Sequence, residues 1–170
     1  MNAERSPEAY MQETLALAAR ALVAGELPIA ALVVLDGSVI ARATTREKQA
    51  GRFLVHAEFL ALEEADRLRL PVPSRRRVKL FTNLEPCLMC LGAAMSFFIG
   101  EIYYGLESPG DGAVALANGW QRKREDFAGY RLPAIVGGVM RRESARLFEQ
   151  YVLTQPAGPM HAWAATLARL

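Results

Sequence analysis

Residues 78–106 read VKLFTNLEPCLMCLGAAMSFFIGEIYYGL and carry the clearest structural pattern in this chain of 170 residues. Val78 to Asn83 has the length and composition of a buried strand, and Pro86 opens a helical stretch that runs to about Phe98. A second apolar run, Glu101 to Leu106, follows directly. Because two strands joined by a helix usually form a crossover unit, these strands are expected to pair in parallel.

The segment before this unit predicts a helix followed by a hairpin. Ser6 has the side chain of a helix N-cap, Pro7 suits the first helical turn, and apolar residues recur until Gly25. The predicted hairpin consists of a strand at Ile29–Leu35, a two-residue turn at Asp36-Gly37 and a strand at Ser38–Ala43.

Further helices and a short strand are predicted in the rest of the chain. Thr44 to Leu54 is polar and irregular, whereas Ala57 to Leu70 has helical spacing. Ile135-Val136 resembles a short strand, and Arg141 to Val152 forms an amphipathic helical pattern. Alternating helices and strands with one opening hairpin indicate an α/β fold, a three-layer α/β/α sandwich with a mixed sheet.

Composition limits the class of protein. The length suits one domain, and a hydrophobic content of 52% is sufficient for a buried core. A net charge of +2 is too mild to indicate nucleic-acid binding by itself. Two cysteines in a C-x-x-C spacing, with no apolar leader and no run long enough to span a membrane, favour a soluble cytoplasmic protein.

Two short motifs contain both cysteines and one of the two histidines of the chain. They are His56-Ala57-Glu58 and Pro86-Cys87-Leu88-Met89-Cys90. Zinc binds thiolate and imidazole, and a catalytic zinc keeps three protein ligands so that water occupies the fourth position. His56, Cys87 and Cys90 supply three such ligands, so the motifs predict a zinc site.

Glu58 gives this predicted site its chemistry. It follows His56 by two residues, where its carboxylate can take a proton from the water and return it to a leaving nitrogen. His56 and Cys87 are each expected at a helix N-terminus, whose free N–H groups favour thiolates. The motifs therefore indicate a hydrolytic deaminase.

Two other interpretations use the same residues. A C-x-x-C pair also occurs in structural zinc sites and in redox-active proteins. A structural site would need a fourth protein ligand, for which only His161 or an acidic residue is available. A redox pair would not need the H-x-E motif. The combined motifs favour a catalytic zinc.

With these motifs the chain resembles the cytidine deaminase-like zinc hydrolases, in the branch of bacterial tRNA adenosine deaminases and guanine deaminases. The resemblance covers about residues 8–153. It rests on Glu26-Leu27-Pro28-Ile29-Ala30-Ala31, on Asn83 to Ala93 around the cysteines, on Ile99-Gly100 with Tyr104-Gly105, and on the passage from Gly138-Val139 into the helix at residues 141–152.

The resemblance implies a five-stranded sheet sandwiched by helices, a zinc ion held by His56, Cys87 and Cys90, Glu58 as proton shuttle, and a homodimer. Residues 1–155 would then form the deaminase domain, with 156–170 as a helical tail packed on it. The substrate is expected to contact five residues, which are Thr45, Ile29, Ala57, Glu85 and Pro86.

The chain departs from the tRNA-modifying relatives around the pocket. Thr44-Thr45 stands where those enzymes usually have an asparagine, and Phe53-Leu54-Val55 replaces their usual approach to the histidine. Ser96-Phe97-Phe98 replaces a basic stretch. Three basic clusters, Arg75-Arg76-Arg77, Arg122-Lys123-Arg124 and Arg141-Arg142, are the best case for contacts with RNA, although such runs are usually just solvated.

Three functions follow from the sequence. The preferred one is a zinc aminohydrolase that acts on a free nucleobase, a nucleoside or a related small heterocycle. The second is deamination of adenosine to inosine in tRNA. The third is a noncatalytic interaction domain that zinc stabilises.

Overall fold

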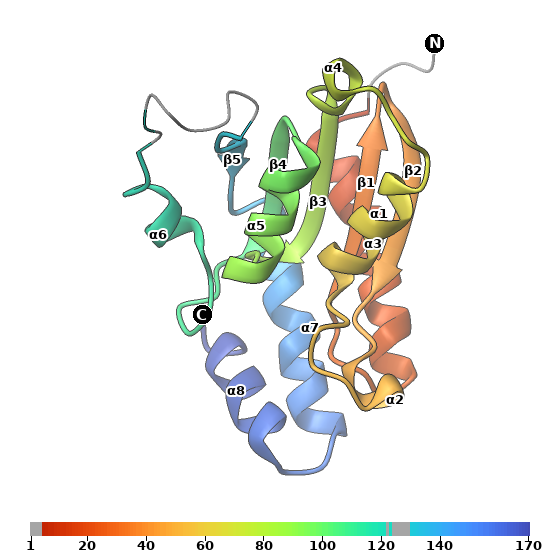
Figure 1. Cartoon of the computed structure of the whole chain (residues 1–170). Helices are drawn as coiled ribbons and strands as arrows, with labels where there is room; N and C mark the ends of the chain where they lie inside the picture. The colour runs from red at the N-terminus through yellow and green to blue at the C-terminus, as the bar shows by residue number, and fades with distance from the viewer. Residues whose placement is uncertain (1–4, 122, 124–129) are drawn as a thin grey trace.

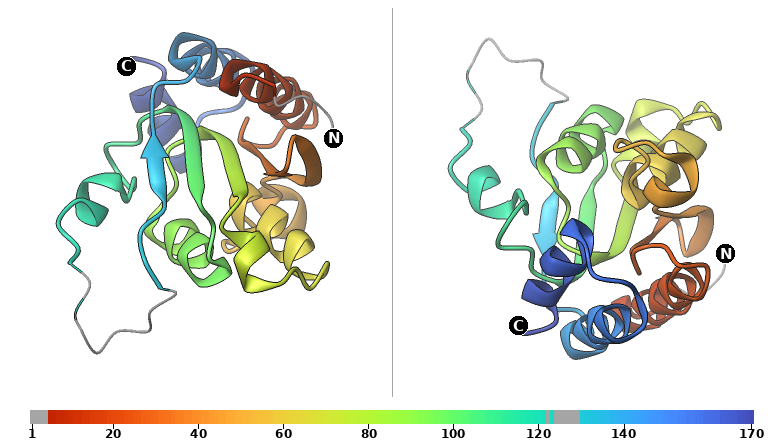
Figure 2. Two further views of the ribbon diagram at one scale, coloured as in Figure 1. Left: turned by 90° about the horizontal axis from the view of Figure 1, so that it is seen from above. Right: turned by 90° about the horizontal axis from the view of Figure 1, so that it is seen from below.

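The computed structural model of the chain describes residues 5–121, 123 and 130–170. A mixed five-stranded sheet lies between two layers of helices (Figures 1 and 2). Helices α1 (Pro7–Val23) and α7 (Arg141–Thr154) cover one face, and α3 (Ala57–Asp66) and α5 (Leu88–Phe97) cover the other. This arrangement confirms the predicted three-layer sandwich.

The strand order in the sheet is β2-β1-β3-β4-β5. Strands β1 and β2 pair antiparallel, as do β1 and β3, whereas β4 pairs in parallel with both β3 and β5. The parallel pairing of β3 and β4 confirms the prediction from residues 78–106. The strands are β1 (Ala30–Leu35), β2 (Ser38–Thr44), β3 (Val78–Leu84), β4 (Glu101–Leu106) and β5 (Ala134–Val136).

Local signals set the first helix and the hairpin. Ser6 caps α1 by accepting a hydrogen bond from the backbone N–H of Ala9, and Pro7 is the first helical residue. Asp36 and Gly37 have φ values of 49° and 81°, the positive pair that a two-residue turn of type I′ requires.

The structure differs from the predicted elements at several boundaries. Cys87 is the N-cap of α5, so Pro86 lies just before the helix and not in its first turn. Helix α3 ends at Asp66, earlier than the predicted Leu70. Three further helices were not predicted because four residues are too few to show periodicity; these are α2 (Glu47–Ala50), α4 (Val72–Arg75) and α6 (Val114–Ala117). The expected helical tail contains one helix, α8 (Pro159–Leu167).

The tail of the chain packs on the rest of the molecule. Helix α8 lies against α7, and Ala164 and Leu167 are buried in the same apolar cluster as Phe148. None of the helices in the described ranges is long and apolar enough to cross a membrane.

Asn83 joins the end of β3 to the beginning of β1 through its side chain. It is fully buried, its Oδ1 accepts from the N–H of Ala30 at 2.8 Å, and its Nδ2 donates to the carbonyl of Pro28 at 2.8 Å. These bonds satisfy two backbone groups that the sheet ladder leaves unpaired.

Replacing Asn83 by leucine should therefore destabilise the fold. The Asn83→Leu variant leaves both backbone groups buried without a partner, and we expect the free energy of unfolding in urea to fall by about 3 kcal/mol. The exposed Asn118 is the matched control, and Asn118→Leu should change stability by less than about 0.5 kcal/mol. Equal stability of the two variants would contradict the role of Asn83.

Candidate active site

The motif residues meet at one edge of the sheet. Strand β3 ends at Leu84, and helices α3 and α5 begin beside it, at the lower edge of the sheet in Figure 1. His56 is the N-cap of α3, Cys87 is the N-cap of α5, and Cys90 follows in its first turn. The site thus lies at the carboxyl end of a parallel strand pair, the usual position in α/β sheets.

The three predicted ligand atoms have the spacing of a tetrahedral zinc site. The Nδ1 atom of His56 is 3.6 Å from the Sγ of Cys87 and 3.7 Å from the Sγ of Cys90. Ligands bound at about 2.3 Å through sulfur and about 2.0 Å through nitrogen lie about 3.6 Å apart in a tetrahedron. His56, Cys87 and Cys90 therefore fit a zinc ion.

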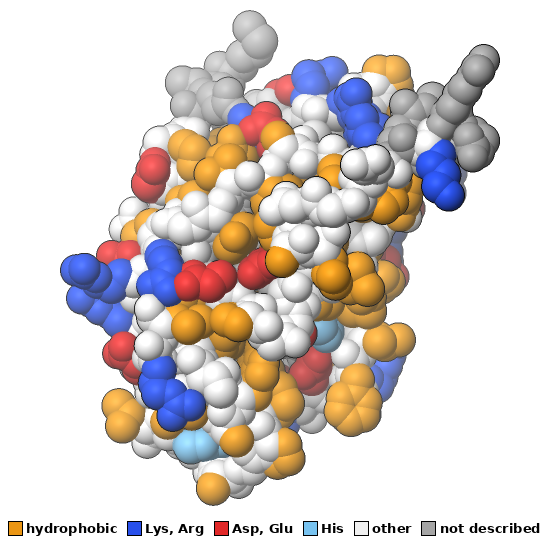
Figure 3. Space-filling model, turned by 90° about the vertical axis from the view of Figure 1, so that its left-hand side faces the viewer, with side chains coloured by type: hydrophobic (Ala, Val, Ile, Leu, Met, Phe, Trp, Pro, Cys, Tyr) orange, Lys and Arg blue, Asp and Glu red, His pale blue; other side chains and the backbone are white. Residues whose placement is uncertain are grey.

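No fourth protein ligand joins this group among the described residues. The Nε2 atom of His161 lies 2.9 Å from the carbonyl oxygen of Val152, on a different part of the molecule. The space-filling view shows histidine side chains at two well separated places (Figure 3). A structural site completed by His161 is thus not what the geometry supports.

The three side chains stabilise a thiolate. A hydrogen bond from Cys90 and the neighbouring His56 lower the pKa of Cys87 to about 4. Cys87, followed by Glu47, raises the pKa of His56 to about 10, and Cys87 with burial raises the pKa of Cys90. The thiolate is the form of cysteine that binds a metal.

Glu58 lies beside the ligands in the first turn of α3. Its side chain is 4% exposed, and burial raises its pKa to about 7. Its Oε2 is 3.7 Å from the Sγ of Cys90, and its Oε1 accepts a hydrogen bond from the hydroxyl of Thr82 at 3.4 Å. A carboxyl group held in this way can exchange protons near neutral pH.

A cavity of about 460 Å³ opens above the ligands and Glu58. Four of the five predicted substrate contacts, Thr45, Ile29, Ala57 and Glu85, line it. Its described walls are otherwise apolar or acidic and contain no lysine or arginine. The remaining lining residues are Leu27, Glu47, Phe53, Leu84, Gly110, Asp111, Met160 and Trp163.

Glu85 lines the cavity, and its carboxylate also holds the loop at residues 108–114 in place. Its two oxygens accept hydrogen bonds from the backbone N–H groups of Ser108 and Val114, both at 2.9 Å. A Cβ atom at Gly112 would lie 2.4 Å from this carboxylate, so glycine is required at that point. Pro86 does not line the cavity; its carbonyl accepts from Ala113.

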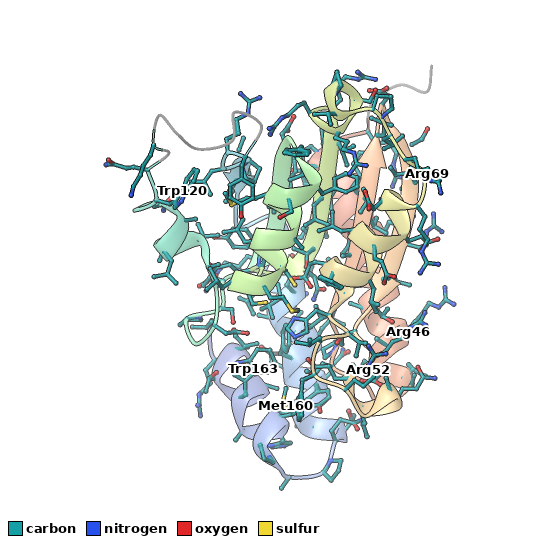
Figure 4. The ribbon with its side chains drawn as sticks, viewed as in Figure 1. Arg46, Arg52, Arg69, Trp120, Met160 and Trp163 are labelled. Carbon is teal, nitrogen blue, oxygen red and sulfur yellow. The ribbon has the colours of Figure 1, made fainter. Side chains whose placement is uncertain are left out.

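Helix α8 supplies one wall of the cavity. Met160 and Trp163 lie on the side of α8 that faces the beginnings of α3 and α5 (Figure 4). The Trp163 ring is held edge-to-face against Phe148 of α7, with ring centroids 6.1 Å apart. Met160 has no sequence signal that separates it from other surface methionines.

Glu47 contacts one of the proposed ligands although the sequence did not indicate it. It belongs to α2, in the stretch predicted to be irregular, and its Oε1 lies 3.0 Å from the Nε2 of His56. A lone glutamate in a polar segment has no pattern from which this contact follows.

The basic clusters are mostly engaged within the chain, and none of their described residues lines the cavity. Arg75 contacts Asp66 at 2.6 Å, Arg77 forms two hydrogen bonds with Asp36, and Arg141 pairs with Glu107. Helix α4, which contains Arg75, lies at the opposite end of the sheet from the site (Figure 1). Arg122 and Arg124, in the cluster at residues 122–124, lie outside the described residues.

The family model for the cytidine and deoxycytidylate deaminase zinc-binding region matches residues 4–106. The chain belongs to this deaminase family. The matched region contains all three proposed zinc ligands and Glu58, together with the hairpin and the strand–helix–strand unit.

Curated relatives of this deaminase-family chain are enzymes that act on tRNA. It is 39% identical over 143 residues to the tRNA(Ile)-lysidine synthase of Deinococcus radiodurans. The matched region covers 84% of this chain but only 24% of that protein. It is 31% identical over 145 residues to the tRNA-specific adenosine deaminase of Bacillus subtilis, and here the matched region covers 85% of this chain and 87% of that protein.

Solved structures with the same fold include two kinds of deaminase. One comes from work on A-to-I editing by tRNA:A34 deaminases, with 31% identity, a TM-score of 0.67 and coverage of 82% of this chain and 98% of that chain. The other is a guanine deaminase from Nitrosomonas europaea, with 25% identity, a TM-score of 0.65 and coverage of 88% of both chains.

Loss of any of the three ligands should remove zinc. His56→Ala, Cys87→Ser and Cys90→Ser are each expected to lose bound zinc on dialysis against a chelator, measured by elemental analysis, and to melt at a lower temperature. His161→Ala changes the only other histidine and should keep one zinc per chain. Zinc retention by His56→Ala would contradict the assigned ligand set.

Proposed function

We propose that the chain is a zinc-dependent hydrolytic deaminase acting on a nucleobase, a nucleoside or a related small heterocycle. The observation that carries this proposal is the placement of a buried Glu58 3.7 Å from Cys90, in the lining of the cavity that His56 and Cys87 also line. In the reaction, water adds its oxygen to the carbon that bears the amine, the carbon–nitrogen bond breaks, and ammonia leaves.

His56, Cys87 and Cys90 would hold the zinc. When bound, zinc supplies a water of lowered pKa as nucleophile. Glu58 would hold the proton that the nucleophile loses and would pass protons to the ring nitrogen and to the departing amine. The hydroxyl of Thr82 keeps the carboxylate directed toward the ligands, since it donates to Oε1 and leaves Oε2 beside Cys90.

The cavity supports a flat substrate without negative charge. Ala57 is fully buried in its wall and adds only a methyl group, which leaves room for a planar ring next to Glu58. Ile29 and Leu84 offer apolar contacts to the ring, and Thr45 offers a hydroxyl whose proton is donated to the carbonyl of Val55. The acidic residues Glu47 and Asp111 would repel an anionic group at this depth.

Deamination of adenosine in tRNA is the second candidate. The similarity to tRNA-specific adenosine deaminases supports it, and so do the residues at the rim of the cavity. Phe53 is 85% exposed there, where it can stack on a base, and Arg46 and Arg52 are exposed on either side of α2 (Figure 4). A noncatalytic zinc-stabilised interaction domain is the third candidate, and it gives no role to a buried Glu58.

Residues 1–155 are proposed to form the deaminase domain, with residues 156–170 packed on it, in a cytoplasmic homodimer. The described surface supports a dimer because hydrophobic side chains are exposed at several places on the face shown in Figure 3. Leu88, Leu116 and Trp120 are 64%, 66% and 36% exposed and line one apolar cavity of about 300 Å³. Sedimentation equilibrium tests the assembly.

Glu58→Gln should separate catalysis from metal binding. The amide keeps the shape of the side chain but cannot carry the proton, so we expect turnover to fall by about 10²–10⁴-fold with zinc content unchanged. Glu63→Gln, on the exposed side of the same helix, is the matched control and should keep its activity. Full turnover by Glu58→Gln would contradict the assigned role of Glu58, whereas no turnover by the zinc-loaded wild type would leave only the noncatalytic candidate.

A substrate panel should distinguish the two enzymatic candidates. The zinc-loaded protein is expected to release ammonia from free bases or nucleosides, and Arg46→Glu with Arg52→Glu should leave that activity within about twofold. If tRNA is the substrate, the same double variant should lose activity on a tRNA transcript and alter its salt dependence. Arg69→Glu, at a distant exposed position, is the control (Figure 4). Inosine formation in tRNA alone would exclude the small-substrate proposal.

A further inference from the structure

The imidazole of His56 is held from both sides. Its Nδ1 faces the two cysteine sulfurs at 3.6 and 3.7 Å, and its Nε2 faces the carboxylate of Glu47 at 3.0 Å. In a neutral imidazole only one nitrogen carries a proton and the other carries the lone pair that binds a metal. A carboxylate beside Nε2 stabilises the proton there and leaves the lone pair on Nδ1.

Glu47 is not a freely moving surface side chain. The carboxylate of the buried Glu26 accepts hydrogen bonds from the backbone N–H groups of Lys48 and Gln49, at 3.2 and 2.5 Å, and so anchors the beginning of α2. The N–H of Arg46 donates to the carbonyl of Val55, which ties this segment to the residue before His56. Both ends of the contact are therefore fixed by backbone bonds.

We propose that Glu47 is a positioning residue that acts through His56. It orients the ring, keeps the proton on Nε2 and makes Nδ1 a stronger ligand. The proposal rests on the proposed zinc binding by His56 and adds a residue outside the two sequence motifs. Carboxylate partners of metal-binding histidines act in this way, and their loss typically weakens metal binding by about 10–100-fold.

A contact with the substrate is the competing role, because Glu47 also lines the cavity. The two roles differ in what they change. A positioning residue alters zinc affinity and the proton position on His56 in the absence of any substrate. A substrate contact alters KM and leaves both of these properties as they are in the wild type.

The test compares Glu47→Ala, Glu47→Gln and Asp111→Asn. Glu47→Ala should bind zinc about 10–100-fold more weakly in a competition with a chromogenic chelator. Glu47→Gln keeps an oxygen that can accept from Nε2–H and should recover part of that loss. Asp111→Asn removes another acid from the same cavity without touching His56, and should leave zinc affinity unchanged.

Nitrogen-15 NMR of the zinc-loaded proteins provides a second measurement. The chain has two histidines, so His161→Ala identifies the ring signals of His56. The wild type should show a protonated Nε2 in slow exchange with water, and Glu47→Ala should show faster exchange of that proton. Wild-type zinc affinity and an unchanged Nε2 signal in Glu47→Ala would overturn the proposal, and a change in KM alone would assign Glu47 to the substrate.

The proposal and the proposed function fail in different ways. A wild-type protein that binds zinc through His56 but deaminates nothing overturns the function and leaves the effect of Glu47 on affinity intact. A normal loss of activity in Glu58→Gln together with full zinc affinity in Glu47→Ala overturns only the role of Glu47. Zinc affinity that is equal in the wild type and in His56→Ala would overturn both.

Discussion

The convergence of two helix N-termini is the constraint on which the site depends. Three ligand atoms within 4.8 Å of one another come from the beginnings of α3 and α5, so these helices must pack closely at one end. Small side chains permit this approach: three of the five buried residues of α3 are alanines, at 57, 61 and 65, and α5 contributes Ala94. The parallel pairing of β3 and β4 then sets where α5 begins.

Four glutamates around this edge show how one side chain serves different purposes in different surroundings. Glu26 and Glu85 accept hydrogen bonds from backbone N–H groups and hold the loops on either side of the cavity. Glu47 contacts a ligand, while Glu58 is buried beside the ligands with a raised pKa. Burying a carboxylate without such partners would cost several kcal/mol, which explains why each has a defined contact.

The family match covers the proposed ligands but only part of the cavity lining. The same domain accounts for about a quarter of the length of a lysidine synthase and for nearly the whole of a tRNA adenosine deaminase. The ligands and Glu58 lie in the region that the family model covers, whereas Met160 and Trp163 lie outside it. Gly110 and Asp111 also lie outside the matched region, whereas the rest of the cavity lining lies within it.

The sequence by itself determined the elements and residues whose signals are local. The H-x-E and C-x-x-C spacings, the N-cap at Ser6 and the turn at Asp36-Gly37 depend only on neighbours along the chain, and the structure places each as expected. Only the tertiary structure decided that Glu47 faces His56, that α8 forms a wall of the cavity, and that Arg75 and Arg77 pair with Asp66 and Asp36. Those contacts join side chains whose distance in space depends on how whole elements pack, and no periodicity in the sequence encodes that distance.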